Sequence, residues 1–359
     1  MPQQTQQPQQ PTRQHLIITG TKRAELGRSR GDQLRDTLAA AYREYAELFR
    51  AAGVDEATEQ RAAAATLDAL AGWRPELIAE LEAIAAASGV TLEQVVALNA
   101  RTEVLAASAK PSNECSTIAA LVGGRQRGVQ TWDWHIELDP FWHTQEVDGP
   151  GYRFVGVTEQ GIIGKIGVNE AGLALHFNIL GHELDGPGGI PMHMLANVVL
   201  TECATVTEAI ELVRAAPITS SSSFTLIDET RAVSLEITPV GVFEIAQQAG
   251  VVVRTNHFQD AGPLERQKPV YEPDSSERLA LVRERLDAGL PADDAALVAL
   301  LESGPGQAPL TCVPDMTQPL GERWATLCTA LSDPGARTLR VLDGTPVEVG
   351  EKTWRELSA

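Results

Sequence analysis

The stretch SNECSTIAALVGGRQRGVQTWDWH, residues 112–135, has the pattern of two β-strands joined by a glycine-rich turn. The runs STIAALV and GVQTWDWH carry the β-branched and aromatic residues that are typical of strands, and GGRQRG supplies the glycines that turns favour. Because a short connection of this kind joins antiparallel strands, the stretch predicts a β-hairpin. It decides the fold, since similar strand-like runs follow it as far as Val253.

A thiol and a carboxylate lie at the open end of this hairpin. Pairing across the turn puts Cys115 opposite His135, which leaves Asp133 about two residues, roughly 7 Å, along the strand. Trp132 and Trp134 alternate with Asp133, so the carboxylate points to the opposite face of the sheet from both indoles. A lone cysteine is commonly a small buried hydrophobe, and this interpretation of Cys115 holds until the other motifs are considered.

Helices precede the hairpin and interrupt or follow the later strands. Ala and Leu recur at three- and four-residue spacing in residues 55–73 and 74–89, which predicts two helices. Strand-like runs fill residues 116–253, with one helix over residues 205–217, and two helices and a strand pair follow Pro263. Long runs of antiparallel strand flanked by amphipathic helices predict an α+β fold with two stacked sheets rather than alternating βαβ units.

Charge and hydropathy exclude several classes of partner. Lys and Arg number 29 against 48 Asp and Glu, a formal charge of -19, so the surface would repel a nucleic-acid backbone. No segment approaches the ~20 apolar residues that a membrane-spanning helix needs. We therefore expect a soluble protein that binds neither nucleic acid nor a membrane.

The amino-terminal residues and the cysteines bear on location and on metal binding. Residues 1–14 are rich in Gln and Pro and lack the apolar core of a signal peptide, which predicts a disordered leader and a cytoplasmic protein. GHELDG lacks the second His of a helical zinc motif, so we expect no metal. The cysteines are too sparse for a disulfide framework and lack metal-site spacing; they are Cys115, Cys203, Cys312 and Cys328.

The order of the motifs carries a family resemblance. NECST, a glycine-rich turn and GVQTWDWH are followed by GLALHFNIL, LIDETRAVSLEITP and VVRTNHF. This order, over residues 15–345, resembles the penicillin acyltransferase family (acyl-CoA:6-aminopenicillanic acid acyltransferases), which are N-terminal-nucleophile (Ntn) hydrolases. The resemblance implies one domain over residues 15–359, folded as a four-layer αββα sandwich with two stacked antiparallel sheets, and no cofactor.

The resemblance also makes Cys115 a nucleophile that becomes the first residue of its own subunit. Its thiol would attack the carbonyl of Glu114, and hydrolysis of the thioester would leave residues 1–114 and 115–359 as a heterodimer of two fragments. The freed α-amino group, which titrates near ~7.7–8.0, would then act as the base for a thiol that titrates near ~8.5.

Four more polar residues receive roles from the resemblance. Asn256 matches the family's Asn near the oxyanion, and Asn178 resembles the Asn that the related bile-salt hydrolases use similarly. Asp133 would lie near the new amine and orient it. Arg323 is our choice for the family's late Arg, which helps to position the nucleophile. Each has an ordinary alternative: a turn Asn bonded to its own backbone, an edge carboxylate in water, or an exposed Arg at the start of a strand.

The substrate pocket is less sharply defined by the sequence. His135 and His257 adjoin proposed site residues and are candidates for contact with substrate, although a neighbouring His is more often a packing or surface residue. We expect the lining to come from residues 142–152 and 258–273.

The expected reaction is amide chemistry through a Cys115 thioester. It would hydrolyse a small N-acyl compound or transfer the acyl group to an amine, with acyl-CoA as one candidate donor. A hydrolase of aminoacyl amines, such as a β-alanyl amine, is an alternative with the same fold. Two further alternatives are an uncleaved, non-catalytic binding or scaffold protein and a thiol-dependent enzyme that never cleaves itself.

Overall fold

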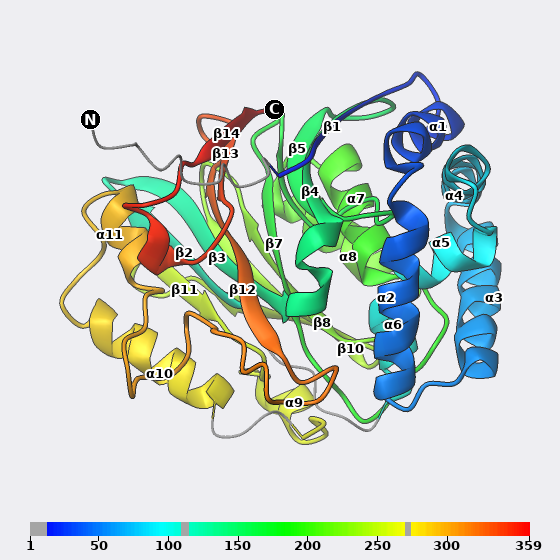
Figure 1. Cartoon of the computed structure of the whole chain (residues 1–359). Helices are drawn as coiled ribbons and strands as arrows, with labels where there is room; N and C mark the ends of the chain where they lie inside the picture. Colours follow the sequence, from blue (N-terminus) through cyan, green and yellow to red (C-terminus); the bar gives the residue numbers. More distant parts are fainter. Residues whose placement is uncertain (1–12, 109–114, 270–273) are drawn as a thin grey trace, which may run out of the picture.

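Two β-sheets stack face to face between two layers of helices in the computed structural model, as far as its described residues show (Figure 1). The structure describes residues 13–108, 115–269 and 274–359. The expected α+β fold, with two stacked sheets at its centre and helices on both outer sides, is confirmed.

Within the described ranges, the larger sheet has eight strands in the order β1-β4-β5-β6-β7-β8-β9-β10. Its strands are β1 (His15–Thr19), β4 (Trp142–Asp148), β5 (Phe154–Glu159), β6 (Ile166–Asn169), β7 (Ala174–Ile179), β8 (Ser222–Ile227), β9 (Ala232–Thr238) and β10 (Gly241–Ala246). Neighbouring strands pair antiparallel except β1 and β4, which are parallel. The expectation of purely antiparallel sheets was wrong for this edge, because β4 is reached only after the helical segment and the hairpin.

The smaller sheet contains the hairpin and has the order β11-β2-β3-β12-β13-β14. Its strands are β2 (Ser116–Val122), β3 (Arg125–His135), β11 (Val251–Arg254), β12 (Trp324–Asp333), β13 (Thr338–Leu342) and β14 (Arg355–Ser358). The central position of β2 and β3 between β11 and β12 confirms that the hairpin organises this sheet.

The register of the hairpin differs from the expected one. Only two glycines, both with positive φ, form the turn, so Ser116 pairs with Thr131. Continuing this register places Cys115 opposite Trp132 rather than His135, and Cys115 contacts the next residue, Asp133. The prediction was wrong because it gave the turn too many residues, and the tighter turn brings the carboxylate closer to the thiol.

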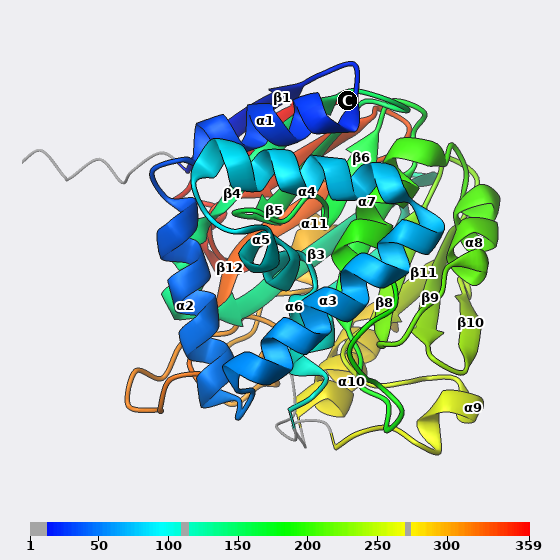
Figure 2. The same cartoon turned by 90° about the vertical axis from the view of Figure 1, so that its right-hand side faces the viewer.

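Helices form the two outer layers (Figures 1 and 2). On the side of the larger sheet lie α1 (Arg23–Leu34), α2 (Leu38–Ala51), α3 (Glu56–Trp73), α4 (Pro75–Ser88), α5 (Leu92–Asn99), α6 (Arg101–Leu105), α7 (Met192–Glu202) and α8 (Val206–Ala215). On the side of the smaller sheet lie α10 (Asp274–Leu286) and α11 (Asp294–Ala299), while α9 (Ala261–Leu264) is a short turn below the sheets. None of the described helices is both long and apolar enough to cross a membrane.

Local sequence signals mark the ends of α4 but did not predict α7. Pro75 opens α4, and Gly89, with a φ of 80°, ends it. The sequence predicted one helix between the strands of the larger sheet, whereas α7 precedes α8 there. The prediction was wrong because α7 is almost entirely buried, so MHMLANVVLTE lacks the polar face that marks an amphipathic helix.

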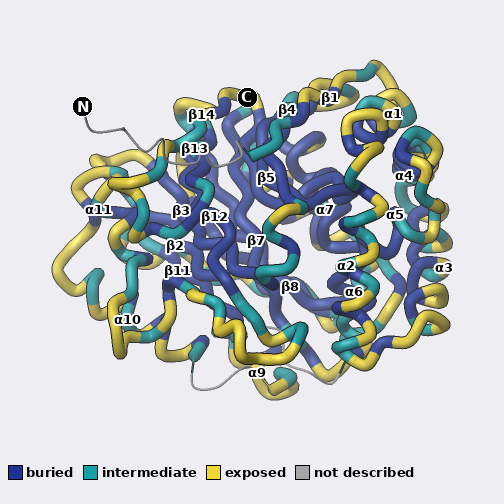
Figure 3. The backbone as a smooth tube through the Cα atoms, in the orientation of Figure 1, coloured by how far each residue is buried: buried dark blue, intermediate teal, exposed yellow. Residues whose placement is uncertain are grey.

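Buried residues make up most of the strands and the inner parts of the helices (Figure 3), and the hydrophobic ones form two core clusters among the described residues. Polar contacts also tie the sheets together. Gln130 of β3 exchanges two hydrogen bonds with the backbone of Phe177 in β7, at 2.5 and 3.1 Å. Arg254 of β11 pairs with Glu236 of β9 at 2.7 Å, and both side chains are fully buried. The relative position of the two sheets is therefore fixed near the site.

Most of the expected leader, residues 1–12, lies outside the described residues. Its last two residues belong to the folded domain. Arg13 forms ion pairs with Asp139 and Asp343, and the backbone carbonyl of Gln14 accepts a hydrogen bond from Thr144 N at 3.2 Å. The folded domain therefore begins before residue 15.

Candidate active site

Cys115 lies immediately before β2 and is buried, with 4% of its surface exposed. Its φ of 88° is a left-handed conformation that non-glycine residues seldom adopt. The backbone N–H donates to Asp133 Oδ2 at 3.4 Å, and Sγ lies 3.9 Å from the Asp133 carbonyl oxygen. Cys115 and Asp133, which the sequence analysis placed at the same end of the hairpin, are thus in contact. Glu114, on the other side of the expected cleavage site, lies outside the described residues.

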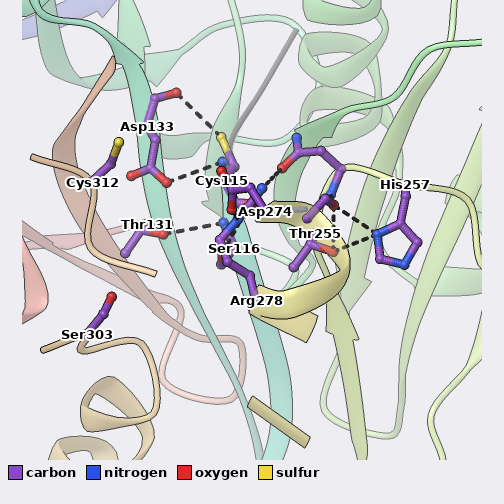
Figure 4. A network of polar contacts seen from close by, with 12 residues as sticks. Cys115, Ser116, Thr131, Asp133, Thr255, His257, Asp274, Arg278, Ser303 and Cys312 are labelled. Carbon is purple, nitrogen blue, oxygen red and sulfur yellow. Dashed lines mark hydrogen bonds and ion pairs between the residues drawn. The ribbon is translucent and has the colours of Figure 1, made fainter. Parts of the chain in front are cut away.

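Arg278 of α10 connects several site residues (Figure 4). Its Nη1 donates to the carbonyl oxygen of Cys115 at 3.1 Å and to Ser116 Oγ at 2.9 Å. Its Nη2 donates to Asn256 Oδ1 at 3.0 Å, and Asp274 holds its Nε at 2.6 Å. Sequence reasoning missed Arg278. The spacing of Asp274 and Arg278 could have predicted an ion pair on one helix face, but not that the guanidinium is buried.

The two candidate asparagines occupy different places. Asn178 Nδ2 donates to the carbonyl oxygen of Cys115 at 2.8 Å, and its Oδ1 accepts from Thr117 Oγ1 at 2.8 Å. Asn256 Nδ2 donates to the carbonyl of Ile179 at 3.0 Å, and Asn256 also lines the cavity described below. Asn178 therefore holds the backbone of Cys115, whereas Asn256 lies at the wall of the cavity.

Asp133 is an almost fully buried carboxyl group. Burial is the largest influence and raises its pKa to about 6. The hydrogen bond from Thr326 Oγ1, at 2.5 Å, the positive charge of Arg278 and the N–H of Cys115 all oppose this rise by favouring the ionised form. Asp133 is therefore mostly ionised at neutral pH and becomes neutral below about pH 6.

A cavity of about 830 Å³ opens next to Asn256. Cys115 does not itself line it, but Arg278 bonds both Cys115 and Asn256. Apolar lining residues include Leu48, Leu105, Trp134, Ile179, Leu180, Val313 and Trp324. Charged lining residues are Asp185, Asp274, Asp315, Glu322 and Lys268. The cavity thus combines apolar walls with more negative than positive side chains.

The expected lining was only partly right. Lys268 and Pro269 come from the second expected segment, residues 258–273. The first, residues 142–152, contributes none of the described lining, because residues 142–148 form a strand inside the larger sheet.

The two candidate histidines and Arg323 lie in three different surroundings. His135 lines the cavity and stacks on Trp324, with ring centroids 4.0 Å apart. His257 instead bonds Ser275 Oγ through Nδ1 at 2.8 Å and borders a separate surface depression. Arg323 pairs with Glu137 at 3.1 Å and donates to a backbone carbonyl at 2.7 Å, so its described contacts do not include Cys115.

The remaining cysteines have other surroundings. None of the four cysteines forms a disulfide in the described structure. Cys203 follows α7 and Cys328 lies in β12, and burial raises the pKa of both, that of Cys203 to about 12. Cys312 lines the cavity. Within the described ranges, no three His, Cys, Asp or Glu side chains form a group that could hold a metal ion.

Comparison of the sequence with known proteins shows the family to which the chain belongs. The family model described as acyl-coenzyme A:6-aminopenicillanic acid acyl-transferase matches residues 124–347. The 40 kDa form of acyl-coenzyme A:6-aminopenicillanic-acid-acyltransferase from Emericella nidulans is 28% identical over 186 residues, which are 51% of this chain and 52% of that protein. The chain thus matches about half the length of this curated relative.

Solved structures with a similar arrangement are more distant. An N-acylethanolamine-hydrolyzing acid amidase ortholog from Caenorhabditis elegans has 16% identity and a TM-score of 0.45, covering 62% of this chain and 93% of its own. A variant of the conjugated bile acid hydrolase from Clostridium perfringens has 13% identity and a TM-score of 0.48, covering 68% and 92%. Since the family model spans more than half of the chain, the protein belongs to the acyl-coenzyme A:6-aminopenicillanic acid acyltransferase family.

Proposed function

We propose that the protein is a self-processing amidohydrolase or acyltransferase whose nucleophile, Cys115, becomes the first residue of a second chain. One observation carries this proposal. Buried polar side chains hold both ends of this residue: Asp133 accepts from its N–H, while Asn178 and Arg278 donate to its carbonyl. A cysteine that only fills the core does not need to be fixed from three separate elements.

Self-processing would begin with attack of the Cys115 thiol on the Glu114 carbonyl. The new S–C bond replaces the C–N bond, the proton of the thiol passes to the released amine, and water then hydrolyses the thioester. The left-handed backbone at Cys115 supports a cut at this place, because such a conformation costs on the order of 1–3 kcal/mol. Once the bond before Cys115 is broken, its φ is no longer constrained and this cost disappears.

The cut protein would then carry its own base. The α-amine of Cys115 would take the thiol proton, and ionised Asp133 would orient that amine. Asn256 is the proposed donor to the oxyanion, since its amide lies at the cavity wall and its oxygen is anchored by Arg278. The resulting thioester is resolved by water or by an amine.

The cavity favours a substrate with an apolar acyl group and a neutral or cationic amine part. Four acidic residues against one lysine line it, so a phosphate-bearing donor such as acyl-CoA would be repelled. The same observation favours the second candidate, hydrolysis of an aminoacyl amine, over penicillin-type substrates that carry a carboxylate.

Intact-mass analysis under denaturing conditions tests the mechanism. We expect the wild type to give two fragments, the larger beginning at Cys115, and Cys115→Ala to remain whole. Cys203→Ala, which removes another buried thiol, is the matched control and should be cut like the wild type. An uncut wild type would disprove self-processing and favour the scaffold or the uncleaved thiol enzyme. Alkylation by iodoacetamide, located by peptide mass spectrometry, separates these two, because Cys115 is labelled only if its thiol is reactive.

A further inference from the structure

Three buried charged side chains lie behind the hairpin, and we name Arg101, Glu159 and Lys165 the inner ion cluster. Glu159, at the end of β5, binds Arg101 Nε at 3.0 Å and Lys165 Nζ at 2.9 Å. Each of the three side chains is only 1% exposed. With two cations and one carboxylate, the cluster places one excess positive charge in the interior.

The two cations rest on the indoles that flank Asp133. Lys165 Nζ lies 3.5 Å from the ring centroid of Trp132, and Arg101 Cζ lies 4.0 Å from that of Trp134. The backbone carbonyl of Asp133, between these two rings in sequence, is the group in contact with Cys115 Sγ. The excess charge is therefore separated from the nucleophile by one layer of aromatic side chains.

Neighbouring groups offset this charge only in part. Burial raises the pKa of Glu103, which is coupled to Arg101, to about 7, so this carboxyl group is only partly ionised at neutral pH. Tyr45 donates to Glu159 and stays protonated, because burial raises its pKa well above the ordinary value. His193 and His143 stay neutral, because burial lowers the pKa of both. In the described part of the chain, Arg101 Nη1 has no hydrogen-bond acceptor. A buried cation with an unused donor is costly unless a negative charge forms nearby.

Cys115 can supply that negative charge. Burial lowers the pKa of Lys165 to about 8, so Lys165 is still mostly protonated at neutral pH. A negative charge on Cys115 opposes the effect of burial on both Lys165 and Arg101 and favours their protonated forms. Because this coupling is reciprocal, both cations favour the thiolate of Cys115 over the thiol.

We propose that Arg101 and Lys165 are positioning residues that hold an excess positive charge behind Cys115 and stabilise its thiolate. The inference rests on the proposed function, in which Cys115 is the nucleophile. Asp133, Asp274 and Arg278 face Cys115 or its partners from the opposite side, and their net negative charge at neutral pH opposes the thiolate. The inner ion cluster offsets this opposition.

Alkylation of Cys115 by iodoacetamide over a range of pH tests this inference. The thiolate attacks the CH₂ group of iodoacetamide, forms an S–C bond and expels iodide, so the rate reports the thiolate fraction. Peptide mass spectrometry separates Cys115 from the other cysteines. In Lys165→Met the midpoint should move about one unit to higher pH, so that the rate at pH 7 falls about tenfold. Lys165→Arg, which keeps the charge, should restore most of the rate.

Arg23→Met is the matched control, because the Arg23–Glu80 pair is also buried but has no contact with the hairpin among the described residues. It should lower stability without moving the midpoint. If Lys165→Met does not fold, Arg101→Gln should show the same upward shift. A midpoint of Lys165→Met or Arg101→Gln equal to that of the wild type would overturn the inference. Absence of Cys115 alkylation in the wild type at every pH would instead overturn the proposed function.

Discussion

Cys115 and Cys203 are two buried thiols with similar exposure, 4% and 2%, and different surroundings. The carbonyl of each accepts a hydrogen bond of 2.8 Å from an asparagine, Asn178 for Cys115 and Asn169 for Cys203. Only around Cys115 do a guanidinium and a carboxylate join this asparagine at the backbone of the cysteine, as far as the described contacts show. Around Cys203, burial raises the pKa of the thiol to about 12. Burial, together with the negative charges of Glu208 and Glu202, thus keeps the Cys203 thiol protonated, whereas Cys115 has a guanidinium among its partners.

Replacing each cysteine by Ala should give the largest difference in activity between the two sites. Cys115→Ala removes the proposed nucleophile, so we expect no measurable amide hydrolysis. Cys203→Ala only leaves a small cavity, which costs about 1 kcal/mol of stability and should leave kcat/KM within about twofold. Steady-state kinetics and thermal unfolding check both. Turnover by Cys115→Ala would contradict the assignment.

Removing the asparagine at each cysteine sharpens the comparison. Asn178→Ala should slow self-cleavage about tenfold or more by releasing the Cys115 backbone, and it should cost on the order of 1–3 kcal/mol of stability. Asn169→Ala should cause a similar loss of stability with unchanged cleavage. Asn256→Ala, at the cavity wall, should lower kcat by about 10²–10³-fold. Equal cleavage rates in Asn178→Ala and Asn169→Ala would show that the first asparagine is only structural.

Two arginines provide the next test. Arg278→Met removes the donor to Cys115 and leaves buried partners unpaired, which should cost about 3–5 kcal/mol of stability and most of the activity. Arg323→Met breaks a partly exposed ion pair with Glu137, and we expect it to lower the free energy of unfolding by at most about 1 kcal/mol. Urea unfolding and kcat/KM measure these effects. A loss of activity in Arg323→Met as large as in Arg278→Met would instead support the role that the sequence gave to Arg323.

The smallest expected effect concerns pH. The hydrogen bond from Thr326 favours ionised Asp133, so Thr326→Val should raise the pKa of Asp133 above about 6. The acidic limb of the activity profile should move to higher pH by up to about one unit. Thr329→Val, on the same strand but bonded to Gly344, is the control. If the acidic limb does not move, a group other than Asp133 determines its pH.

The sequence predicted the parts of the fold that depend on local patterns. Residues 116–122 follow a strand pattern, and Gly123 and Gly124 make a turn, so the hairpin could be anticipated. The all-buried α7 could not be anticipated as a helix, because its pattern has no polar face.

The candidate site was predictable only where residues lie close in sequence or match a motif. Cys115 and Asp133 belong to one hairpin, and its register brings Cys115 opposite Trp132, the residue next to Asp133. Arg278 reaches Asn256 across 22 residues and Cys115 across 163, so no local pattern indicates either contact. The inner ion cluster likewise joins a helix to a strand of the larger sheet and is seen only in three dimensions.

The parallel pairing of β1 with β4 has a consequence for how the protein must be made. The proposed cut before Cys115 would assign β1 to one chain and β4 to the other, so a single sheet would be completed by two polypeptides. Without β1, the edge of β4 would be open to aggregation. Recovery of the cut protein from denaturant then becomes a second-order reaction that quickens with concentration, whereas the uncut Cys115→Ala chain refolds at a concentration-independent rate. Under the proposed mechanism, folding would therefore have to precede cleavage.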